Sequence, residues 1–280
     1  MRMSVVTRFA PSPTGRLHLG HAYAALFAAR AAREAGGRFL LRIEDIDATR
    51  CRPEFEQAIH DDLGWLGLTW EQPVRRQSEH MADYAAALEN LKAQHLIYPC
   101  FCTRAEIRTE IARAGAAPHG SEGPLYPGTC RHLDDAERAR RIASGTPYAL
   151  RLDAEKASSM AGKLTWHDRE RGTVTADWRT HGDVVLARKE TPTSYHLSVT
   201  LDDHLQGVTL VTRGTDLFEA THIHRLLQAL LGLGTPDYHH HGMITGPGGE
   251  RLAKRAGAPT LQSLREAGRT SAEVKAMAGF

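Results

Sequence analysis

Two segments of the 280-residue chain combine glycine with basic side chains in a way that suits phosphate chemistry. The first, Pro-Ser-Pro-Thr-Gly-Arg-Leu-His-Leu-Gly-His, places His18 and His21 three residues apart around Gly20. At the start of a helix this spacing puts both imidazoles on one side, where free N–H groups and the helix dipole attract an anion. Gly20 allows close approach of a ligand, and imidazole can donate to a phosphoryl group. The alternative is that both histidines only cap a helix.

The second segment runs from Gly248 to Arg255 and contains Lys254. A glycine-flanked basic loop can close over a triphosphate and stabilise the leaving pyrophosphate. Alone it is more typical of a basic surface loop. Together the two segments predict adenylyl transfer, in which ATP is cleaved between its α- and β-phosphates. The candidate catalytic residues are His18, His21 and Lys254, and the candidate ATP-binding residues are the same three and Gly20.

Three of the four cysteines form a possible metal site. Cys100 and Cys102 are separated by a single residue, and Cys130 follows later in the chain. Three thiolates and one further ligand would complete a tetrahedral structural zinc site. The alternative is three inert thiols. The residues themselves leave the fourth ligand open among His119, His132, Tyr126 and Cys51.

A βαβ unit must position the first phosphate segment. The pattern predicts a strand over residues 4–10, an alanine-rich helix from Gly20 to the glycine pair at 36–37, and a strand over residues 38–43. Such a unit implies a parallel sheet with a right-handed crossover, hence an α/β fold. The ligand site should lie at the carboxyl end of the first strand.

The rest of the chain continues the alternation of helices and strands. Residues 103–147 are rich in Ala, Arg, Gly and Pro without clean periodicity, so we expect an inserted, partly irregular segment there. Helices are predicted over 53–66, 81–94 and 220–231, and strands over 184–188, 195–201 and 208–212.

The composition limits the classes of function. Lys plus Arg number 35 against 33 Asp plus Glu, a net charge of +2, which excludes a polybasic arm or acidic tail and confines any nucleic-acid contact to a local patch. No apolar stretch approaches ~20 residues, and the N-terminus lacks a signal-peptide core, so we expect a cytoplasmic protein. The run His239 to His241 is internal and does not indicate an expression tag.

Four motifs, in order, resemble the signatures of class I glutamyl-tRNA synthetases, and the resemblance spans residue 4 to about residue 256. It implies a Rossmann-like class I catalytic domain with an inserted zinc-binding subdomain. His18 to His21 matches the HIGH motif of that family. Arg251 to Arg255 matches its KMSKS loop, with Arg for the first lysine and Ala for the serine; Lys254 keeps the second lysine and is assigned the ATP contact. The motifs are Arg8-Phe-Ala-Pro-Ser-Pro-Thr-Gly, His18-Leu-Gly-His, Arg42-Ile-Glu-Asp-Ile-Asp and Arg251-Leu-Ala-Lys-Arg.

The resemblance also implies a glutamate pocket. Glutamate carries two carboxylates and an ammonium, so Arg8 could hold a carboxylate bidentately while Glu44 pairs with the ammonium. The alternative is an ion pair between Arg8 and Glu44 at the strand ends. The residues that resemble the family's glutamate site are Arg8, Phe9, Ala10, Pro11, Ser12, Glu44, Tyr195 and Arg213.

Short paralogues in this family, the glutamyl-Q tRNA(Asp) synthetases, have a zinc module similar to Cys-x-Cys followed by Tyr-x₃-Cys. This similarity implies that Tyr126 joins Cys100, Cys102 and Cys130, and that one structural zinc ion braces the insertion. Only 25 residues (280 − 255) follow Arg255, so we expect no anticodon-binding domain. The implied reaction is tRNA-independent, ATP-dependent activation of glutamate, with Mg²⁺, and transfer to the queuosine base of tRNA(Asp).

The expected domain organisation has four parts. Residues 1–98 and 183–256 would form the two halves of the catalytic domain, 99–182 the zinc-containing insertion and connective segment, and 257–280 a short helical tail. The expected partners are glutamate, ATP and queuosine-containing tRNA(Asp), with no membrane and a monomeric protein. Phosphate contacts could come from Arg104, Arg108 and Arg113, although a solvated helix face explains each of these singly.

Three other functions remain open at this point. A glutamyl-tRNA synthetase reduced to its catalytic domain would share the chemistry. An inactive paralogue would bind tRNA or an amino acid without catalysis, and the degenerate loop around Lys254 keeps that alternative open. A small-molecule adenylyltransferase could also use His-x-Gly-His, but the segment from Arg8 and the pair of Glu44 and Arg213 argue against it.

Overall fold

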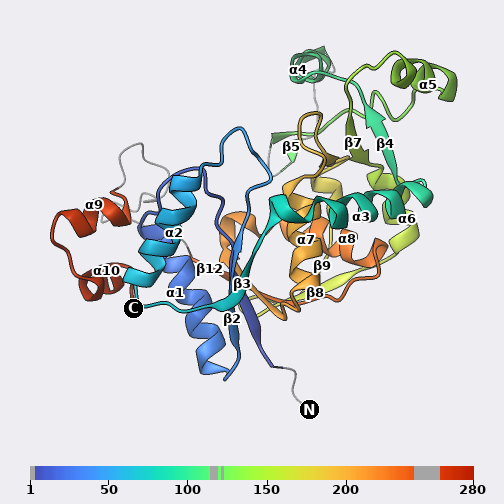
Figure 1. Ribbon diagram of the computed structural model, residues 1–280. Coiled ribbons are helices and arrows are strands. Elements are labelled where there is room, and N and C mark those ends of the chain that lie inside the picture. Colours follow the sequence, from blue (N-terminus) through green and yellow to red (C-terminus); the bar gives the residue numbers. More distant parts are fainter. Residues whose placement is uncertain (1–3, 114–118, 121–122, 243–258) are drawn as a thin grey trace.

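The computed structural model describes residues 4–113, 119–120, 123–242 and 259–280. It begins with the predicted βαβ unit, made of β1 (Val6–Phe9), α1 (Leu19–Glu34) and β2 (Arg38–Ile43). Helix α1 ends where Gly36 adopts a φ of 60°, a left-handed conformation that favours glycine. Strands β1 and β2 pair in parallel, which confirms the predicted crossover (Figure 1).

The central sheet has the strand order of a doubly wound α/β fold. One part consists of the parallel strands β1, β2 and β3 (Glu71–Arg76). The other part has the order β11-β12-β8-β9, and Thr209 N donates to Val6 O at 3.0 Å where β1 meets β11. The order of strands therefore reverses between β1 and β11, and such a switch point is where open α/β sheets bind ligands. The bounds are β8 (Thr165–Asp168), β9 (Gly172–Thr175), β11 (Leu210–Gly214) and β12 (Asp237–His241).

Alternating side chains of the first strands enter two separate hydrophobic cores. Phe9 and Leu41 pack with α1, α2 and the C-terminal helices, whereas Val6 and Leu40 pack with α3, α7 and α8 on the opposite face. This period of two is what a strand covered on both faces requires. The bounds are α2 (Pro53–Trp65), α3 (Met81–Ala93), α7 (Tyr195–Leu205), α8 (Ala220–Leu230), α9 (Leu261–Glu266) and α10 (Ser271–Met277).

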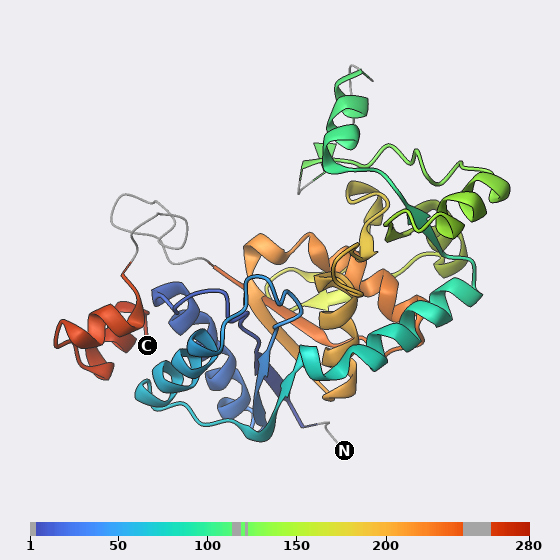
Figure 2. The same ribbon diagram turned by 45° about the horizontal axis from the view of Figure 1, so that its top comes forward.

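An arm extends from the sheet and carries Cys100, Cys102 and Cys130. Its base is an antiparallel sheet in which β7 (Ala149–Leu152) lies between β4 (Ile97–Cys100) and β10 (Val185–Ala187). Helices α4 and α5 lie at the far end, away from α1 and α2, in both views (Figures 1 and 2). The remaining elements are α4 (Arg104–Arg113), β5 (His119–Gly120), β6 (Gly123–Pro124), α5 (Asp135–Ala143), α6 (Ala154–Ala161) and the 3₁₀ turns Gln77–His80, Trp178–Thr180 and Thr215–Leu217.

The predicted strand over residues 195–201 is wrong, because this segment is the first part of helix α7. Its aromatic and β-branched residues favour a strand, and its apolar residues alternate with polar ones. In the fold, Leu197 to Asp203 are all buried, since α7 packs against both α3 and α8. A helix covered on several sides has no solvent face, so it lacks the 3.6-residue pattern that would have revealed it.

The C-terminal helices return to the beginning of α1. Leu261 N donates to Leu17 O at 2.8 Å, and Thr260 forms a β-bridge with His18. Helix α9 contacts α2, and α10 contacts α1. In the described part of the chain, no helix combines the length and apolar character needed to cross a membrane.

Candidate active site

The two motif histidines occupy the first turn of α1 and bond to its backbone. His18 is the N-cap, and its Nδ1 accepts from Gly20 N at 3.1 Å; Nδ1 of His21 accepts from His18 N at 3.2 Å. The helix-capping alternative is therefore what the structure shows. It does not exclude a phosphate role, because a ring that accepts at Nδ1 carries its proton on Nε2 and can donate from there.

Both imidazoles are held neutral. Burial lowers the pKa of His18, and burial together with the neighbouring His18 lowers the pKa of His21 to about 4. The ring centroids are only 3.8 Å apart, so protonating both would place two cations in contact. Near neutral pH the pair therefore supplies hydrogen-bond donors without a fixed positive charge.

A pocket of about 280 Å³ opens beside these histidines at the switch point of the sheet. His18, Gly20 and His21 line one side, and Gly214 and His241 line the other. The residues thus come from the start of α1, in the segment after β1 where the βαβ pattern predicted the site, and from the ends of β11 and β12. Lys254 and the segment from Arg251 to Arg255 lie outside the described residues.

Arg8, a predicted glutamate-site residue on β1, does not pair with Glu44. Its Nε and Nη2 donate to the two carboxylate oxygens of Asp203 at 2.8 and 3.2 Å, and Nη1 donates to Thr212 O at 3.1 Å. The predicted alternative of an Arg8–Glu44 ion pair is therefore wrong. Three of the five guanidinium N–H groups are used, which leaves two for a ligand carboxylate.

Glu44 is held by Arg42, a residue that the sequence reasoning did not assign. Arg42 is fully buried and donates from Nη2 to Glu44 at 3.0 Å and from Nη1 to Asp203 at 2.8 Å. Burial raises the pKa of Glu44, and Arg42 and Arg8 oppose that shift. For Asp203, burial alone would raise the pKa, but Arg8 and Arg42 outweigh it and keep the pKa below its usual range.

Tyr195 and Arg213 complete this site from the second half of the fold. Arg213 Nη1 donates to the Tyr195 hydroxyl at 3.3 Å. Burial raises the pKa of Tyr195, and the charges of Arg213, Glu44 and Arg8 all act on that pKa. Four predicted residues therefore lie close enough for their charges, which are of both signs, to act on one another.

The other predicted glutamate-site residues form the last position of β1 and the loop that follows it. Pro11 O accepts from Glu44 N at 3.0 Å and so joins the two strand ends. Phe9 turns its side chain into the hydrophobic core, so only its backbone faces the site. Ala10 is partly buried, and Ser12 is exposed with its Oγ 3.9 Å from Cys51 Sγ.

Arg213 is surrounded by further polar residues that sequence reasoning missed. Its Nε donates to His240 Nε2 at 3.1 Å, and its other nitrogens bond His224 at 3.2 Å and Thr221 at 2.5 Å. Asp168 then bonds His240 Nδ1 at 2.7 Å. The only signal in the sequence was the histidine run at 239–241, which carried no indication of a partner.

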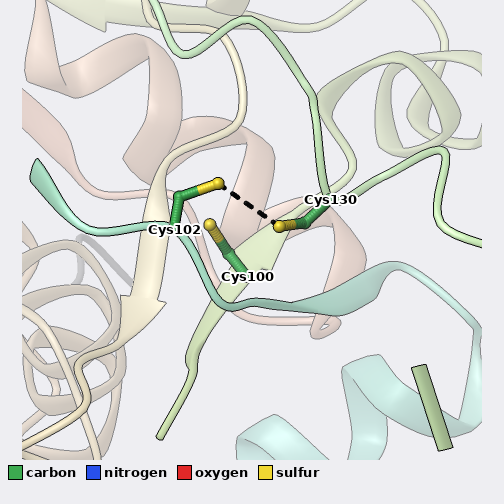
Figure 3. Close-up of side chains that lie close together, drawn as sticks. All are labelled: Cys100, Cys102 and Cys130. Atoms are coloured by element: carbon green, nitrogen blue, oxygen red, sulfur yellow. Dashed lines mark hydrogen bonds between the residues drawn. The ribbon is translucent and has the colours of Figure 1, made fainter. Parts of the chain in front are cut away.

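The predicted metal ligands come together in the arm (Figure 3). The three sulfur atoms of Cys100, Cys102 and Cys130 lie within 4.8 Å of one another, and Cys102 and Cys130 are 3.4 Å apart. The hydroxyl of Tyr126 lies 3.4 Å from Cys100 Sγ and 3.6 Å from Cys102 Sγ. Cys51 instead contacts Ser12, and the side chain of His119 lies outside the described residues.

These distances fit one tetrahedral ion. With Zn–S of about 2.3 Å and Zn–O of about 2.0 Å, tetrahedral angles place sulfur and oxygen about 3.5 Å apart. Burial raises the pKa of Tyr126 and raises that of Cys102 to about 12, while for Cys130 the hydrogen bonds from Tyr126 and Phe101 N outweigh burial and lower it. A bound cation would favour loss of the remaining protons.

Proteins with similar sequences are named as tRNA synthetases. The sequence profile of tRNA synthetases class I (E and Q), catalytic domain, matches residues 4–274. A Rhodobacter capsulatus protein named glutamyl-Q tRNA(Asp) synthetase is 50% identical, with 99% of this chain and 100% of that protein covered. A Nocardia farcinica protein of the same name is 45% identical, with 96% and 82% covered.

A similar fold occurs in a solved structure. The crystal structure of a glutamate tRNA ligase from Elizabethkingia meningosepticum, in complex with its amino acid, has a TM-score of 0.75 at 28% identity. The match covers 95% of this chain and 53% of that one, so this chain spans about half of that neighbour's length.

Proposed function

Because the chain belongs to the family of class I tRNA synthetases for glutamate and glutamine, and is thus a ligase, we propose that it activates glutamate with ATP and transfers the glutamyl group to queuosine of tRNA(Asp). The observation that carries the proposal is that Arg8, Glu44, Tyr195 and Arg213 lie close enough for their charges to act on one another, next to the histidine-lined pocket that Gly214 helps to line. This arrangement offers charges of both signs to an amino acid and neutral donors to a nucleotide.

In the first step, the glutamate carboxylate attacks the α-phosphorus of ATP. A P–O bond forms as the bond to the β-phosphate bridging oxygen breaks, giving glutamyl-adenylate and pyrophosphate. His18 and His21 donate from Nε2 to the phosphoryl oxygens as negative charge develops there, while the arginines and Glu44 hold glutamate in place. Mg²⁺ enters with ATP as part of the substrate.

In the second step, a hydroxyl of the queuosine cyclopentenediol attacks the carbonyl carbon of glutamyl-adenylate. The ester forms, AMP leaves with the electrons of the broken C–O bond, and the hydroxyl proton passes to the phosphate or to water. The histidine donors are already directed at the phosphate, so no covalent intermediate with the enzyme is needed.

Lys254 is proposed to contact the phosphates of ATP. Its support comes from the described residues on either side of its segment, because Gly242 lines the pocket with His18 and Thr260 forms a bridge with His18. Replacing Lys254 by alanine should slow adenylate formation and leave the fold intact. A loss of both activity and thermal stability would contradict this role.

A structural zinc ion held by Cys100, Cys102, Cys130 and Tyr126 is proposed for the arm. The sulfur and oxygen distances support this ligand set. When bound, zinc would neutralise the thiolates and fix the loop of residues 126–130 to the end of β4; it would have no part in adenylate formation. The four-part domain division also remains a proposal.

The arm is also the proposed site of tRNA phosphate contacts. Arg104 and Arg108 are exposed on α4, whereas the side chain of Arg113 lies outside the described residues. Basic side chains at this place could hold the RNA backbone without reading its sequence. We further propose that the protein is monomeric and works in the cytoplasm.

The acceptor can be tested with two forms of tRNA(Asp), one with queuosine and one with guanosine at the same position. Labelled glutamate should enter only the queuosine form, and nuclease digestion should place the label in the anticodon fragment. A form trimmed of its 3′-terminal adenosine should be labelled equally well. Equal labelling of both forms, or loss of label on trimming, would contradict the proposed acceptor and favour a catalytic-domain glutamyl-tRNA synthetase.

Activation itself can be tested without tRNA. Glutamate should support exchange of labelled pyrophosphate into ATP, and aspartate and glutamine should support it poorly. Absence of exchange with every amino acid would favour an inactive paralogue that only binds tRNA or an amino acid.

A further inference from the structure

Strand β12 turns its three consecutive histidines to two different faces of the sheet. His239 and His241 contact Phe27 of α1, with ring centroids 4.7 and 4.9 Å away. His240 points to the opposite face, where it is 3% exposed and lies between Asp168 and Arg213. The alternation of a strand thus places one imidazole of the run beside the glutamate site.

Asp168 fixes the proton of His240 on Nδ1. The Asp168 side chain is fully buried, and its Oδ1 accepts the backbone N–H groups of Glu170 and Arg171 at 3.0 and 3.1 Å. Its Oδ2 accepts from His240 N at 3.2 Å and lies 2.7 Å from His240 Nδ1. A carboxylate with four such neighbours can only accept, so Nδ1 of His240 must donate.

The other ring nitrogen of His240 is consequently an acceptor, and it faces Arg213. Arg213 Nε donates to His240 Nε2 at 3.1 Å, and Arg213 as a whole is only 6% exposed. Burial, with a contribution from Arg213, lowers the pKa of His240 to about 4 although Asp168 opposes the shift, which keeps this acceptor available at neutral pH. Guanidinium planes are rigid, so fixing the Nε edge fixes the direction of both terminal nitrogens.

We propose that Asp168 and His240 are positioning residues that orient Arg213 toward a carboxylate of glutamate. The inference rests on the proposed function, in which Arg213 binds that carboxylate. Asp168 sets the tautomer of His240, and His240 sets the angle of the guanidinium. The pair acts before the chemical step and should affect the affinity for glutamate much more than the affinity for ATP.

The most informative variant is Asp168→Asn, which changes the tautomer with little change in shape. The amide oxygen is needed by the backbone N–H groups of Glu170 and Arg171, so the NH₂ group faces His240 Nδ1. The ring proton must then move to Nε2, where it opposes the Nε–H of Arg213 and faces Thr221 Oγ1, 3.2 Å away, as its alternative acceptor. We expect KM for glutamate in pyrophosphate exchange to rise on the order of tenfold, while KM for ATP changes less than about twofold.

A second readout follows the proton directly. In protein labelled with ¹⁵N-histidine, the ring signals of His240 should show a protonated Nδ1 in the parent and a protonated Nε2 in Asp168→Asn. His240→Gln, whose Oε1 can replace Nε2 as acceptor, identifies the signals and should restore much of the glutamate affinity compared with His240→Leu. A purely structural link between β8 and β12 would lower stability in all three variants without this order of glutamate KM values.

The matched control is His239→Gln on the same strand. His239 Nε2 lies 2.8 Å from the exposed Glu170 carboxylate and has no contact with Arg213, so its KM for glutamate should stay at the parent value. Arg213→Lys distinguishes failure of the proposed glutamate site from failure of the positioning role. An unchanged glutamate KM in Arg213→Lys would overturn the proposed glutamate site. A raised KM there, with parent values in both Asp168→Asn and His240→Leu, would overturn the positioning role alone.

Discussion

The wall of the proposed glutamate pocket and the cysteine cluster of the arm both gather polar atoms in buried places, but in the pocket wall the charges are paired by direct hydrogen bonds between guanidinium and carboxylate. Arg8 and Arg42 share Asp203, with contacts of 2.8 Å to each guanidinium. In the cluster, Cys102 and Cys130 face each other across 3.4 Å with the Tyr126 hydroxyl beside them, and all of these groups become anionic when they lose a proton. The pocket wall is thus organised by the chain itself, whereas the cluster offers a set of donors to the proposed metal ion.

The two regions should therefore depend on different interactions: the pocket wall on ion pairs within the chain, and the arm on the proposed metal ion. A buried ion network keeps the pocket rigid before substrate arrives, which reduces the ordering needed on binding. A loop held by the proposed metal ion could be ordered or released without altering the pocket, because such an ion would join only the end of β4 and the loop of residues 126–130. If so, a change in one region should leave the other unaffected.

Metal removal should have the largest effect, and it should be confined to the arm. A strong chelator should increase protease cleavage within residues 100–130 by at least about tenfold, because structural zinc sites supply much of the folding free energy of their surroundings. Hydrogen exchange of β1 and β11 should stay unchanged. Cys51→Ser, which removes a thiol outside the cluster, serves as the control. Cleavage that is indifferent to the chelator would argue against a zinc ion in the arm.

Removing Asp203 should be the most damaging single change in the pocket wall. Asp203→Ala leaves Arg8 without its bidentate partner and Arg42 with fewer acceptors, and uncompensated buried charge costs about 3–5 kcal/mol of unfolding free energy. The control is Glu71→Ala, whose bidentate partner Arg38 is 51% exposed. That change should cost about 0–1 kcal/mol in the same urea titration. Similar losses in both variants would show that the pocket network does not depend on burial.

Much of the framework could be predicted from the sequence because its signals are local. The proline, glycine and alanine patterns located β1, α1, β2 and α2 within a few residues. The charge network could not be predicted, because Arg8 and Asp203 are 195 positions apart and no local pattern links them. The mistaken strand at 195–201 hid the network further, because it left Asp203 outside every predicted element, whereas Asp203 belongs to helix α7.

The candidate zinc ligands, unlike the charge network, could be named from the sequence and the family resemblance. The sequence alone offered four candidates for the fourth ligand, and the family resemblance indicated Tyr126. The structure places the Tyr126 hydroxyl beside two of the sulfur atoms. Ligand type is easier to predict from sequence because few side chains can serve as zinc donors, whereas many can complete an ion network.

The phenolic ligand can be tested by Tyr126→Phe. This change keeps the ring beneath the Arg151 guanidinium, which lies 3.9 Å from its centre, and removes only the oxygen. The zinc dissociation constant should rise at least about tenfold in competition with a chromophoric chelator, because the tetrahedral set loses one donor. Tyr148→Phe, a neighbour that packs on Phe101, should bind zinc as the parent does. Parent affinity in Tyr126→Phe would instead indicate a fourth ligand other than the phenol oxygen.

The smallest expected effect concerns pH and the helices behind the pocket. Burial, reinforced by the charges of His181, Arg213 and Arg188, lowers the pKa of His196 to about 3. Because the unfolded state has the ordinary value of about 6.5, it binds more protons than the folded state between these two values. The stability linked to His196 is therefore complete above about pH 6.5 and is lost as the pH falls through that window.

Between pH 7.5 and pH 6, one such histidine should account for about 1 kcal/mol of lost unfolding free energy. His196→Gln removes that titration, so its unfolding free energy should fall less steeply over this range than that of the parent, whatever its value at pH 7.5. Chelator-treated protein should keep the parent slope, since His196 contacts Tyr195 and His224 rather than the proposed metal ligands of the arm. A slope that changes with zinc removal, or that is the same in His196→Gln, would show that the two regions are not independent in the way their charges imply.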